Sequence, residues 1–272
     1  MIQTRPKELL ELSVERCCRV LCISRAAYYK PARKFSEREL DLVRQTLALK
    51  VIFPTCGYRT VAANLGLSFK SARSLMRRHG LQAGRSRPKD RSRVVRIPSD
   101  ANLMLQAELT LPSRTFAADV THIRLRSGAA YVASILDVCT RQIVGWAISK
   151  SNDTALVSAA LSKLLSSRPL LQGWIHHSDR GSNYSSDAYI ELVRDWGGIS
   201  SFSDPGSPTQ NAYAESFFST FKREEAGKEV YTNLQDAENA ISAYILLYNS
   251  MRLHSSVGWK TPDQYYAEIS SH

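Results

Sequence analysis

The chain has 272 residues, which is enough for one large domain or for two or three small ones. Its hydrophobic content of 43% is ordinary for a globular protein and excludes disorder along the whole chain. Lys and Arg number 36 against 25 Asp and Glu, a net charge of +11. Residues 1–100 alone hold 22 basic and 8 acidic residues, whereas residues 101–272 hold 14 basic and 17 acidic ones. This division predicts a module that binds a polyanion, joined to a nearly neutral second part.

Several classes of protein are excluded by the same sequence. No apolar run approaches the ~20 residues of a membrane span, so no membrane partner is expected. Charged side chains between Met1 and Leu12 argue against a signal peptide. The cysteines are odd in number, five, and no Cys-x-x-Cys pair meets a spaced pair of His, which argues against a disulfide framework and a zinc finger. We therefore expect structural thiols in a reducing cytoplasm, at Cys17, Cys18, Cys22, Cys56 and Cys139.

The first third of the chain is predicted to be helical throughout. Residues 13–29 have the length and apolar spacing of a helix-turn-helix, which ends at Pro31, so residues 1–34 are predicted to form a first helix-turn-helix segment. A helix is predicted over Glu37–Val51, broken by Pro54 and Gly57. One face of this helix is apolar and consists of Leu40, Val43, Leu47 and Val51.

Residues 35–83 are predicted to form a second helix-turn-helix, which binds DNA. A helix over Tyr58–Leu65 is followed by a turn, and Ser68 is the expected N-cap of a helix over Phe69–His79. The apolar face of that helix is predicted to be buried and comprises Phe69, Ala72, Leu75 and Met76. Its basic face is predicted to contact DNA through Lys70, Arg73, Arg77 and Arg78. The alternative is a solvated basic helix, which the surrounding positive charge makes the weaker hypothesis.

The remaining sequence is predicted to hold a basic linker, an α/β core and a helical extension. The linker covers residues 84–113 and is rich in Arg up to a boundary near Pro98, the core covers residues 114–228, and the extension covers residues 229–272. The predicted order of strands and helices gives a mixed sheet flanked by helices. Strands are expected at Thr115–His122, Ala130–Asp137, Gln142–Ile148, Gly173–His177 and Ile199–Ser203. Helices are expected at Asp153–Ser166, Ser185–Trp196, Asn211–Glu225 and Asn233–Tyr248.

Three carboxylates lie where such a fold gathers functional groups. Asp119 lies in the first strand, and Asp179 follows directly after the strand that ends at His177. Glu215 lies on a predicted helix, on one stripe with Asn211, Ser219 and Lys222 and opposite the phenylalanines. Each acid alone is more commonly a cap or a surface charge. Together they predict a site for hard cations, in which two ions ~3.5–4 Å apart assist a phosphoryl displacement.

The spacing of these residues closely resembles that of the DDE transposases and retroviral integrases. Asp119 and Asp179 are separated by 59 residues and Asp179 and Glu215 by 35, with HSDRGS around Asp179 and Lys222 seven residues after Glu215. The closer resemblance is to insertion-sequence transposases of the IS-three type, specifically the product of their second reading frame. Further motifs that carry it are Gly57–Tyr58–Arg59 and the run to Leu81, the run Arg141–Trp146, and Tyr248, Asn249, Arg252, His254, Gly258, Thr261 and Pro262.

The resemblance implies an RNase H-like catalytic core behind an all-α DNA-binding region. It implies a DNA transposase that binds the terminal inverted repeats of a mobile element and uses Asp119, Asp179 and Glu215 as catalytic metal ligands. The cofactor is expected to be two Mg²⁺ ions, with Mn²⁺ as a substitute, and the freed 3′-OH is expected to attack a phosphodiester. Further DNA contacts are expected from Arg180, Asn211, Lys222 and Arg252.

The same resemblance implies partners and a location. Double-stranded DNA is expected as both the element ends and the target, bound by a homo-oligomer in a synaptic complex. A small helix-turn-helix protein of the upstream frame is a further expected partner, because this chain has no sustained heptad repeat of its own. The location is expected to be the bacterial cytoplasm, in association with the nucleoid.

Other functions remain as alternatives. A structure-specific nuclease with the same core would not need two helix-turn-helix units, and a transcription factor built on an inactive core would not need intact carboxylates. A tyrosine recombinase would use Tyr265 or Tyr266 but would leave the acids unexplained. At single residues, His177 could contact phosphate or be satisfied at a strand end, and Asp137 is more readily a turn residue than a fourth acid. Arg252 and His254 could orient the C-terminal segment or contact DNA.

Overall fold

The computed structural model describes residues 14–20, 24, 35–84, 102–105, 107, 109–204, 208–227 and 230–271. The chain divides into two compact units, Met1–Gln45 and Thr46–His272, which are described separately. The predicted boundary near Pro98 lies outside the described residues, and the predicted domain limits stay predictions. Within the described residues, no helix is both long and apolar enough to cross a membrane.

The first unit contains α1 (Val14–Val20) and the beginning of α3 (Glu37–Ile52). The first of these lies within the predicted first helix-turn-helix segment, and the rest of that segment falls almost entirely outside the described residues. The second agrees with the helix predicted from Glu37. The described residues do not cover its apolar face, however, because Leu40, Leu47 and Val51 are 41%, 45% and 77% exposed. Periodicity identifies an apolar face but not the surface that covers it.

The second unit begins with the end of α3, α4 (Tyr58–Leu65) and α5 (Phe69–Arg78). The turn between α4 and α5 forms as predicted, because Gly66 adopts the left-handed conformation that favours glycine and the Ser68 hydroxyl caps α5 by accepting from the Ser71 N–H. These helices share a small core made of Phe53, Cys56, Val61, Ala62, Ala72 and Met76.

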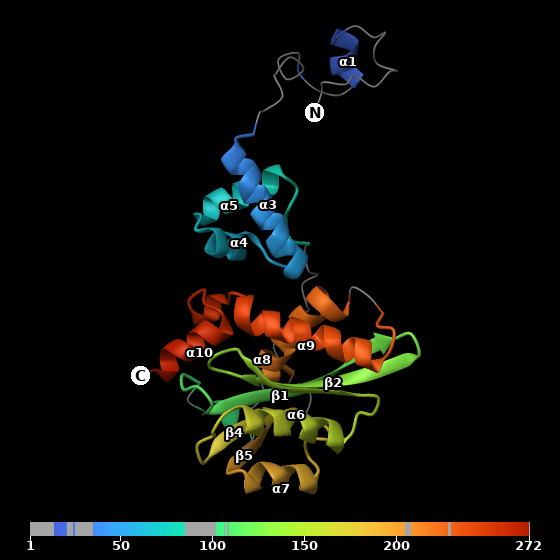
Figure 1. Cartoon of the computed structure of the whole chain (residues 1–272), viewed down its shortest axis with the longest axis vertical. Coiled ribbons are helices and arrows are strands. Elements are labelled where there is room, and N and C mark those ends of the chain that lie inside the picture. Colours follow the sequence, from blue (N-terminus) through green and yellow to red (C-terminus); the bar gives the residue numbers. More distant parts are fainter. Residues whose placement is uncertain are drawn as a thin grey trace. The chain divides into compact units, whose positions relative to one another are not determined.

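A five-stranded mixed sheet forms the centre of the second unit (Figure 1). The strands are β1 (Thr115–Leu125), β2 (Gly128–Asp137), β3 (Ile143–Ser149), β4 (Trp174–Ser178) and β5 (Gly198–Phe202). Their order across the sheet is β3-β2-β1-β4-β5. The first three form an antiparallel meander, and β4 and β5 run parallel to β1. All five predicted strands are present, and the predicted RNase H-like mixed-sheet fold is confirmed.

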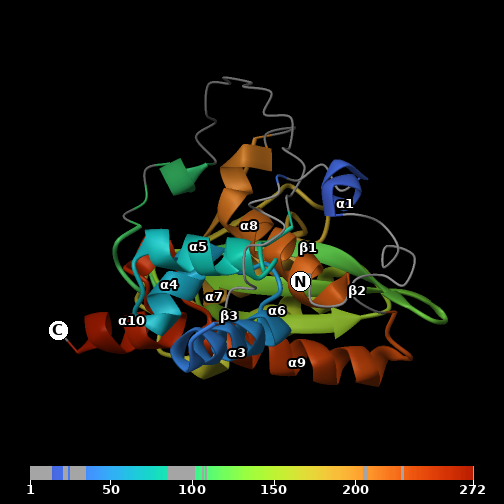
Figure 2. The ribbon, with the colours of Figure 1, turned by 90° about the horizontal axis from the view of Figure 1, so that it is seen from above.

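Helices cover both faces of this sheet (Figures 1 and 2). One face packs on α8 (Ala212–Phe221) and α9 (Leu234–Met251), and the other packs on α6 (Thr154–Ser167) and α7 (Asp187–Asp195). The chain ends with α10 (Pro262–Ser270), which begins in a capping box formed by Thr261 and Gln264. Shorter elements are η2 (Leu103–Leu105), η3 (Pro208–Asn211), η4 (Lys222–Ala226) and η5 (Ser255–Val257).

A glycine permits close packing of α6 on the sheet. A Cβ at Gly145 in β3 would overlap the backbone carbonyl oxygen of Ala160 in α6. Because only glycine lacks that atom, the helix can approach the strand at this point. This contact explains one glycine of the Arg141–Trp146 run that the sequence singles out.

One predicted helix differs from the structure in a way that bears on function. The helix predicted over Asn211–Glu225 is α-helical only to Phe221 and continues as η4, a π-helical turn over Lys222–Ala226. Such turns are rare and often lie at functional sites.

Candidate active site

The sheet brings Asp119 and Asp179 to neighbouring positions. In the parallel pair of β1 and β4, Ala117 lies opposite His177. Each aspartate comes two residues later, Asp119 within β1 and Asp179 directly after the end of β4, so the two lie near one another at that end of β4. Asp119 shares a face of β1 with Ala117, which is buried in the core under α8. The Asp119 carboxylate accepts a hydrogen bond from the Val120 N–H at 2.8 Å, and that of Asp179 accepts one from the Gly181 N–H at 3.0 Å.

The third carboxylate reaches the same place through the start of α8. The buried Asn211 precedes this helix, and its amide donates to the backbone carbonyl of Ala118 at 2.9 Å. This bond attaches the helix to β1 directly beside Asp119. Glu215 lies one turn further on, and the buried side of the helix comprises Ala214, Phe217, Phe218 and Phe221. The predicted apolar side is therefore confirmed, whereas Asn211, predicted to lie on the polar stripe, is buried.

The charges of these groups act on one another. The pKa of Asp119 is raised to about 6, chiefly by burial and to a smaller extent by the negative charges of Asp179 and Glu215, whereas the Val120 N–H and Lys222 oppose the shift. The carboxylates therefore form one electrostatic cluster, in which Asp119 carries a penalty for being ionised. The exposed Lys222, the residue that follows α8, contributes positive charge to the same cluster.

The donor set suits a hard divalent cation, which binds carboxylate oxygens. As they stand, no three Asp, Glu, His or Cys side chains of the described residues are grouped closely enough to hold a metal ion. Burial first, and then the negative charges of Asp179 and Glu215, raise the pKa of Asp119, and a bound cation would oppose this shift by favouring the ionised carboxylate. The carboxylates thus fit a divalent cation by the type of their donor atoms.

Tyr184 is a member of this neighbourhood that the sequence reasoning did not select. It is buried, and burial, Tyr189, Asp119 and Asp179, in that order, raise the pKa of its phenol well above the usual 10. The available signal was its place in the same HSDRGSNY turn, five residues after Asp179.

His177 is satisfied inside the protein. It is fully buried, and its ring nitrogens share hydrogen bonds with the hydroxyls of Ser201 and Ser203 at 2.8 and 3.1 Å. Of the two interpretations left open by the sequence, the structure supports the strand-end residue. Arg180 is exposed beside Asp179, and its Nε donates to the Ser203 carbonyl at 3.1 Å.

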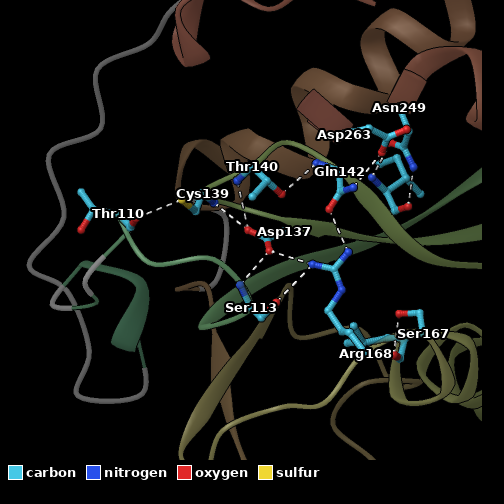
Figure 3. A network of polar contacts seen from close by, with 12 residues as sticks. Thr110, Ser113, Asp137, Cys139, Thr140, Gln142, Ser167, Arg168, Asn249 and Asp263 are labelled. Atoms are coloured by element: carbon cyan, nitrogen blue, oxygen red, sulfur yellow. Dashed lines mark hydrogen bonds and ion pairs between the residues drawn. The ribbon is translucent and has the colours of Figure 1, made fainter. Parts of the chain in front are cut away.

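Asp137 is a buried turn residue rather than a fourth acid of the site (Figure 3). Its carboxylate accepts from the backbone N–H groups of Ser113, Cys139 and Thr140 and pairs with Arg168 at 3.4 Å. The preferred sequence interpretation is confirmed, since every contact of this carboxylate fixes the chain around the end of β2.

Arg252 is not directed to the carboxylate cluster. Its guanidinium binds the buried Glu224 through two hydrogen bonds, Nε to Oε2 at 3.1 Å and Nη2 to Oε1 at 3.0 Å. The predicted contact of Arg252 with DNA stays a prediction. Sequence reasoning did not select Glu224, although helical spacing from Phe217 and Phe221 places this acid on the buried side of its helix and so indicates a buried partner.

The predicted DNA-binding helix exposes its cations. Ala72, Leu75 and Met76 are buried in α5, as predicted, whereas Phe69 is 49% exposed, contrary to prediction. Phe69 is the first residue of the helix and contacts the rings of Tyr58 and Trp259 rather than the core. The side exposed to solvent carries Lys70, Arg73, Arg77 and Arg78. The guanidinium of Arg73 also lies 5.8 Å from the centre of the Tyr58 ring.

Comparisons with known proteins agree with this arrangement. Residues 110–208 and 199–262 match the integrase core domain. The transposase of insertion sequence element IS904 from Lactococcus lactis is 34% identical over 211 residues, covering 75% of this chain and 83% of that protein. The chain belongs to the insertion-sequence transposases of the DDE class. The InsF transposase of insertion sequence IS3A from Escherichia coli is 28% identical over 275 residues, covering 95% of this chain and 96% of the relative.

The transposase is thus a DNA polynucleotidyl transferase of the IS3 type, as its motifs indicate. A 31 kDa protein of insertion element IS600 from Shigella sonnei is 31% identical over 260 residues, covering 90% of the transposase and 95% of that protein. Among solved structures, the HTLV-2 integrase catalytic core in complex with magnesium is 14% identical with a TM-score of 0.43, covering 58% of the transposase and 99% of the integrase core.

Proposed function

We propose that Asp119, Asp179 and Glu215 are the catalytic residues of the transposase and hold two Mg²⁺ ions, which Mn²⁺ can replace. The observation that carries this proposal is that Asp179 and Glu215 come from elements attached to β1 and that the charges of both act on Asp119. Asp119 lies in β1 and Asp179 directly follows the parallel neighbour strand β4, and Glu215 lies one turn after an asparagine attached to β1. The raised pKa of Asp119 supports it, since a divalent cation would compensate the charge of the cluster.

When bound, the ions would promote ionisation of the attacking hydroxyl and stabilise charge on the leaving oxygen in an in-line displacement. Asn211 holds α8 against β1, which fixes the position of Glu215 relative to Asp119. Lys222 would hold a phosphate of the DNA near the scissile bond, because its ammonium is exposed and its charge acts on Asp119. Water first cleaves the strand, and the freed 3′-OH of the element then attacks the target phosphodiester. Neither displacement forms a bond between the protein and DNA.

The terminal inverted repeats would be bound by α5. Its exposed cations Lys70, Arg73, Arg77 and Arg78 suit phosphate and base-edge contacts, and the Ser68 cap and the turn before it suit entry into the major groove. Arg180 is proposed to contact the DNA nearer the cleavage site. The contact predicted for Asn211 is not proposed, because its side chain is buried and its amide donates to the Ala118 carbonyl. The expected basic linker over residues 84–113 would add contacts to the backbone.

The active form is proposed to be a homo-oligomer that holds both element ends, with the helix-turn-helix protein of the upstream frame as an additional partner. A protein that acts on bacterial DNA would work in the cytoplasm, at the nucleoid. These proposals follow from membership of the transposase family and from the positive charge of residues 1–100.

The assignment of the catalytic residues is tested by Asp179→Asn and Glu215→Gln in the full-length protein. Each variant removes a metal-binding charge with little change of shape, so cleavage of a DNA fragment carrying an element end should be abolished in Mg²⁺. End binding and thermal stability should be retained. Asp195→Asn, an exposed change at the end of α7, is the matched control and should cleave normally. Mg²⁺-dependent cleavage by either active-site variant would remove that residue from the site.

A further inference from the structure

Glu224 is a fully buried carboxylate with a complete set of partners. One oxygen accepts from Arg252 Nη2 at 3.0 Å and from the Thr55 hydroxyl, and the other accepts from Arg252 Nε at 3.1 Å and from the Tyr244 hydroxyl at 2.9 Å. The residue itself has no exposed surface, and the Arg252 side chain is 17% exposed. The Arg252–Glu224 ion pair is bidentate, and each carboxylate oxygen also accepts a hydrogen bond from a hydroxyl. A buried ion pair with all its partners in place holds its neighbours in one geometry.

The position of Glu224 connects this cluster to the active site. It lies two residues after Lys222, within the π-helical turn η4 that directly continues α8. The end of the turn is also tightly packed, because a Cβ at Gly227 would overlap the carbonyl oxygen of Lys222. Any change in how Glu224 is held would therefore alter the turn from which the Lys222 side chain projects.

The same cluster reaches the helical segment formed by residues 46–81. Thr55 lies between α3 and α4, and its neighbour Phe53 packs in the core of that segment, with Leu247 of α9 against the same core. The guanidinium of Arg252 lies 5.7 Å from the centre of the Phe53 ring. Glu224 is thus the point at which the helices proposed to bind DNA meet the helix that carries Glu215.

We propose that Glu224 is a positioning residue of the transposase, which joins Thr55 to Arg252 and thereby holds the π turn so that Lys222 faces the carboxylate cluster. Binding of an element end by α4 and α5 would then stabilise the active position of Lys222 through Thr55. This role rests on the proposed function of Lys222, and it goes beyond that function by naming the route that leads from the DNA-binding helices to the catalytic helix.

A single-group change tests the route without removing the ion pair. Thr55→Val keeps the shape of the side chain and deletes only the hydroxyl that donates to Glu224. We expect single-turnover cleavage of a bound element end to fall about tenfold, the effect of one hydrogen bond to a charged group, while end binding stays unchanged. Thr55→Ser restores the hydroxyl and should restore the rate. The control Thr232→Val removes an exposed hydroxyl before α9 and should cleave as the wild type does.

A double-mutant cycle distinguishes this role from a merely structural one. If Thr55 acts through Lys222, the Thr55→Val change should have little further effect on cleavage in a Lys222→Ala background. If Thr55 had only a structural role, Thr55→Val would lower thermal stability. The cleavage rate of the double variant would then fall by the product of the two single losses. The proposal would be overturned if the activation free energies of the two single variants simply added in the double variant, or if Thr55→Val cleaved at the wild-type rate.

Glu224→Gln is a less favourable test, because it leaves the Arg252 charge buried without its counter-charge and can prevent folding. Arg252→Lys keeps the positive charge but loses the bidentate contact with Glu224, so it should lower cleavage more than end binding. A failure of this proposal can be told apart from failure of the catalytic assignment. In the first case Thr55→Val cleaves normally and Glu215→Gln does not, whereas in the second case Glu215→Gln also cleaves.

Discussion

The charge of Asp119 should cost the metal-free transposase folding free energy, and Asp119→Asn should remove that cost. The pKa of this carboxyl rises from its ordinary 3.8 to about 6 in the folded protein, chiefly because it is buried. The folded state therefore holds a proton more tightly than the unfolded state, and stability falls as the pH rises from about 4 through 6. Above pH 6 the loss is complete and amounts to at most about 3 kcal/mol, at 1.36 kcal/mol per pH unit.

The asparagine variant retains the shape and can still accept the Val120 N–H, but it cannot ionise. In EDTA at pH 8 we expect it to melt about 5–10 °C above the wild type, from ~2–4 °C per kcal/mol for a domain of this size. At pH 4 the two proteins should melt at nearly the same temperature. The assay is thermal unfolding followed by circular dichroism at both pH values, with Asp195→Asn as a surface control.

Addition of Mg²⁺ at pH 8 extends the same experiment. The cation should raise the melting temperature of the wild type, because it compensates the charge that burial penalises, and should raise that of Asp119→Asn much less. A variant that is no more stable than the wild type at pH 8, or equally stabilised at pH 4, would refute the reasoning about this carboxyl.

Three further outcomes are expected. Changing Lys70, Arg73 and Arg77 together to Ala should weaken binding of full-length transposase to element ends and make the log–log salt slope shallower by about 3, measured by fluorescence anisotropy; an unchanged slope would remove α5 from the interface. Lys222→Ala should lower cleavage and binding to pre-cleaved ends while the melting temperature stays constant, and Lys222→Glu should be worse; wild-type cleavage by the alanine variant would contradict its role. Burial lowers the pKa of His176 to about 3, so the unfolded state takes up the proton first and stability falls as the pH drops below about 6.5. In denaturant titrations of His176→Gln, the unfolding free energy should change with pH less steeply, by about 1.4 kcal/mol per pH unit between pH 6 and 4. A slope equal to that of the wild type would show that this imidazole does not contribute.

The sequence was most informative where one local signal decides one local structure. Alternation in Thr115–His122 identified β1 and the face on which Asp119 lies, and β1 proved three residues longer than predicted. Ser68 identified the start of α5, because the hydroxyl of an N-cap residue binds the helix backbone wherever the helix lies. The polar stripe of α8 followed from helical geometry, since the phenylalanines on the opposite side could only be buried.

The sequence was least informative where a distant segment decides the outcome. Phe69 looks like a core residue by its spacing, but its neighbours in space are Tyr58 and Trp259, and it stays half exposed. The role of Arg252 was open because its partner, Glu224, lies 28 residues earlier in the chain. The π turn has no local signature either, since its buried Glu224 finds its partners in two distant segments, Thr55 before α4 and Tyr244 and Arg252 of α9 and its C-cap.

Two glutamates of one continuous helical run illustrate how position determines what a carboxylate does. Glu215 lies on the side of α8 that faces Asp119, where its charge adds to the charge of a partly buried acid. Glu224 lies nine residues later on the buried side, where a guanidinium and two hydroxyls neutralise and bind it. The first arrangement favours binding of a cation from solution, and the second favours a fixed backbone. Because Lys222 lies between them in the chain, rigidity supplied by Glu224 would act directly on the ammonium that we propose holds the DNA beside Glu215.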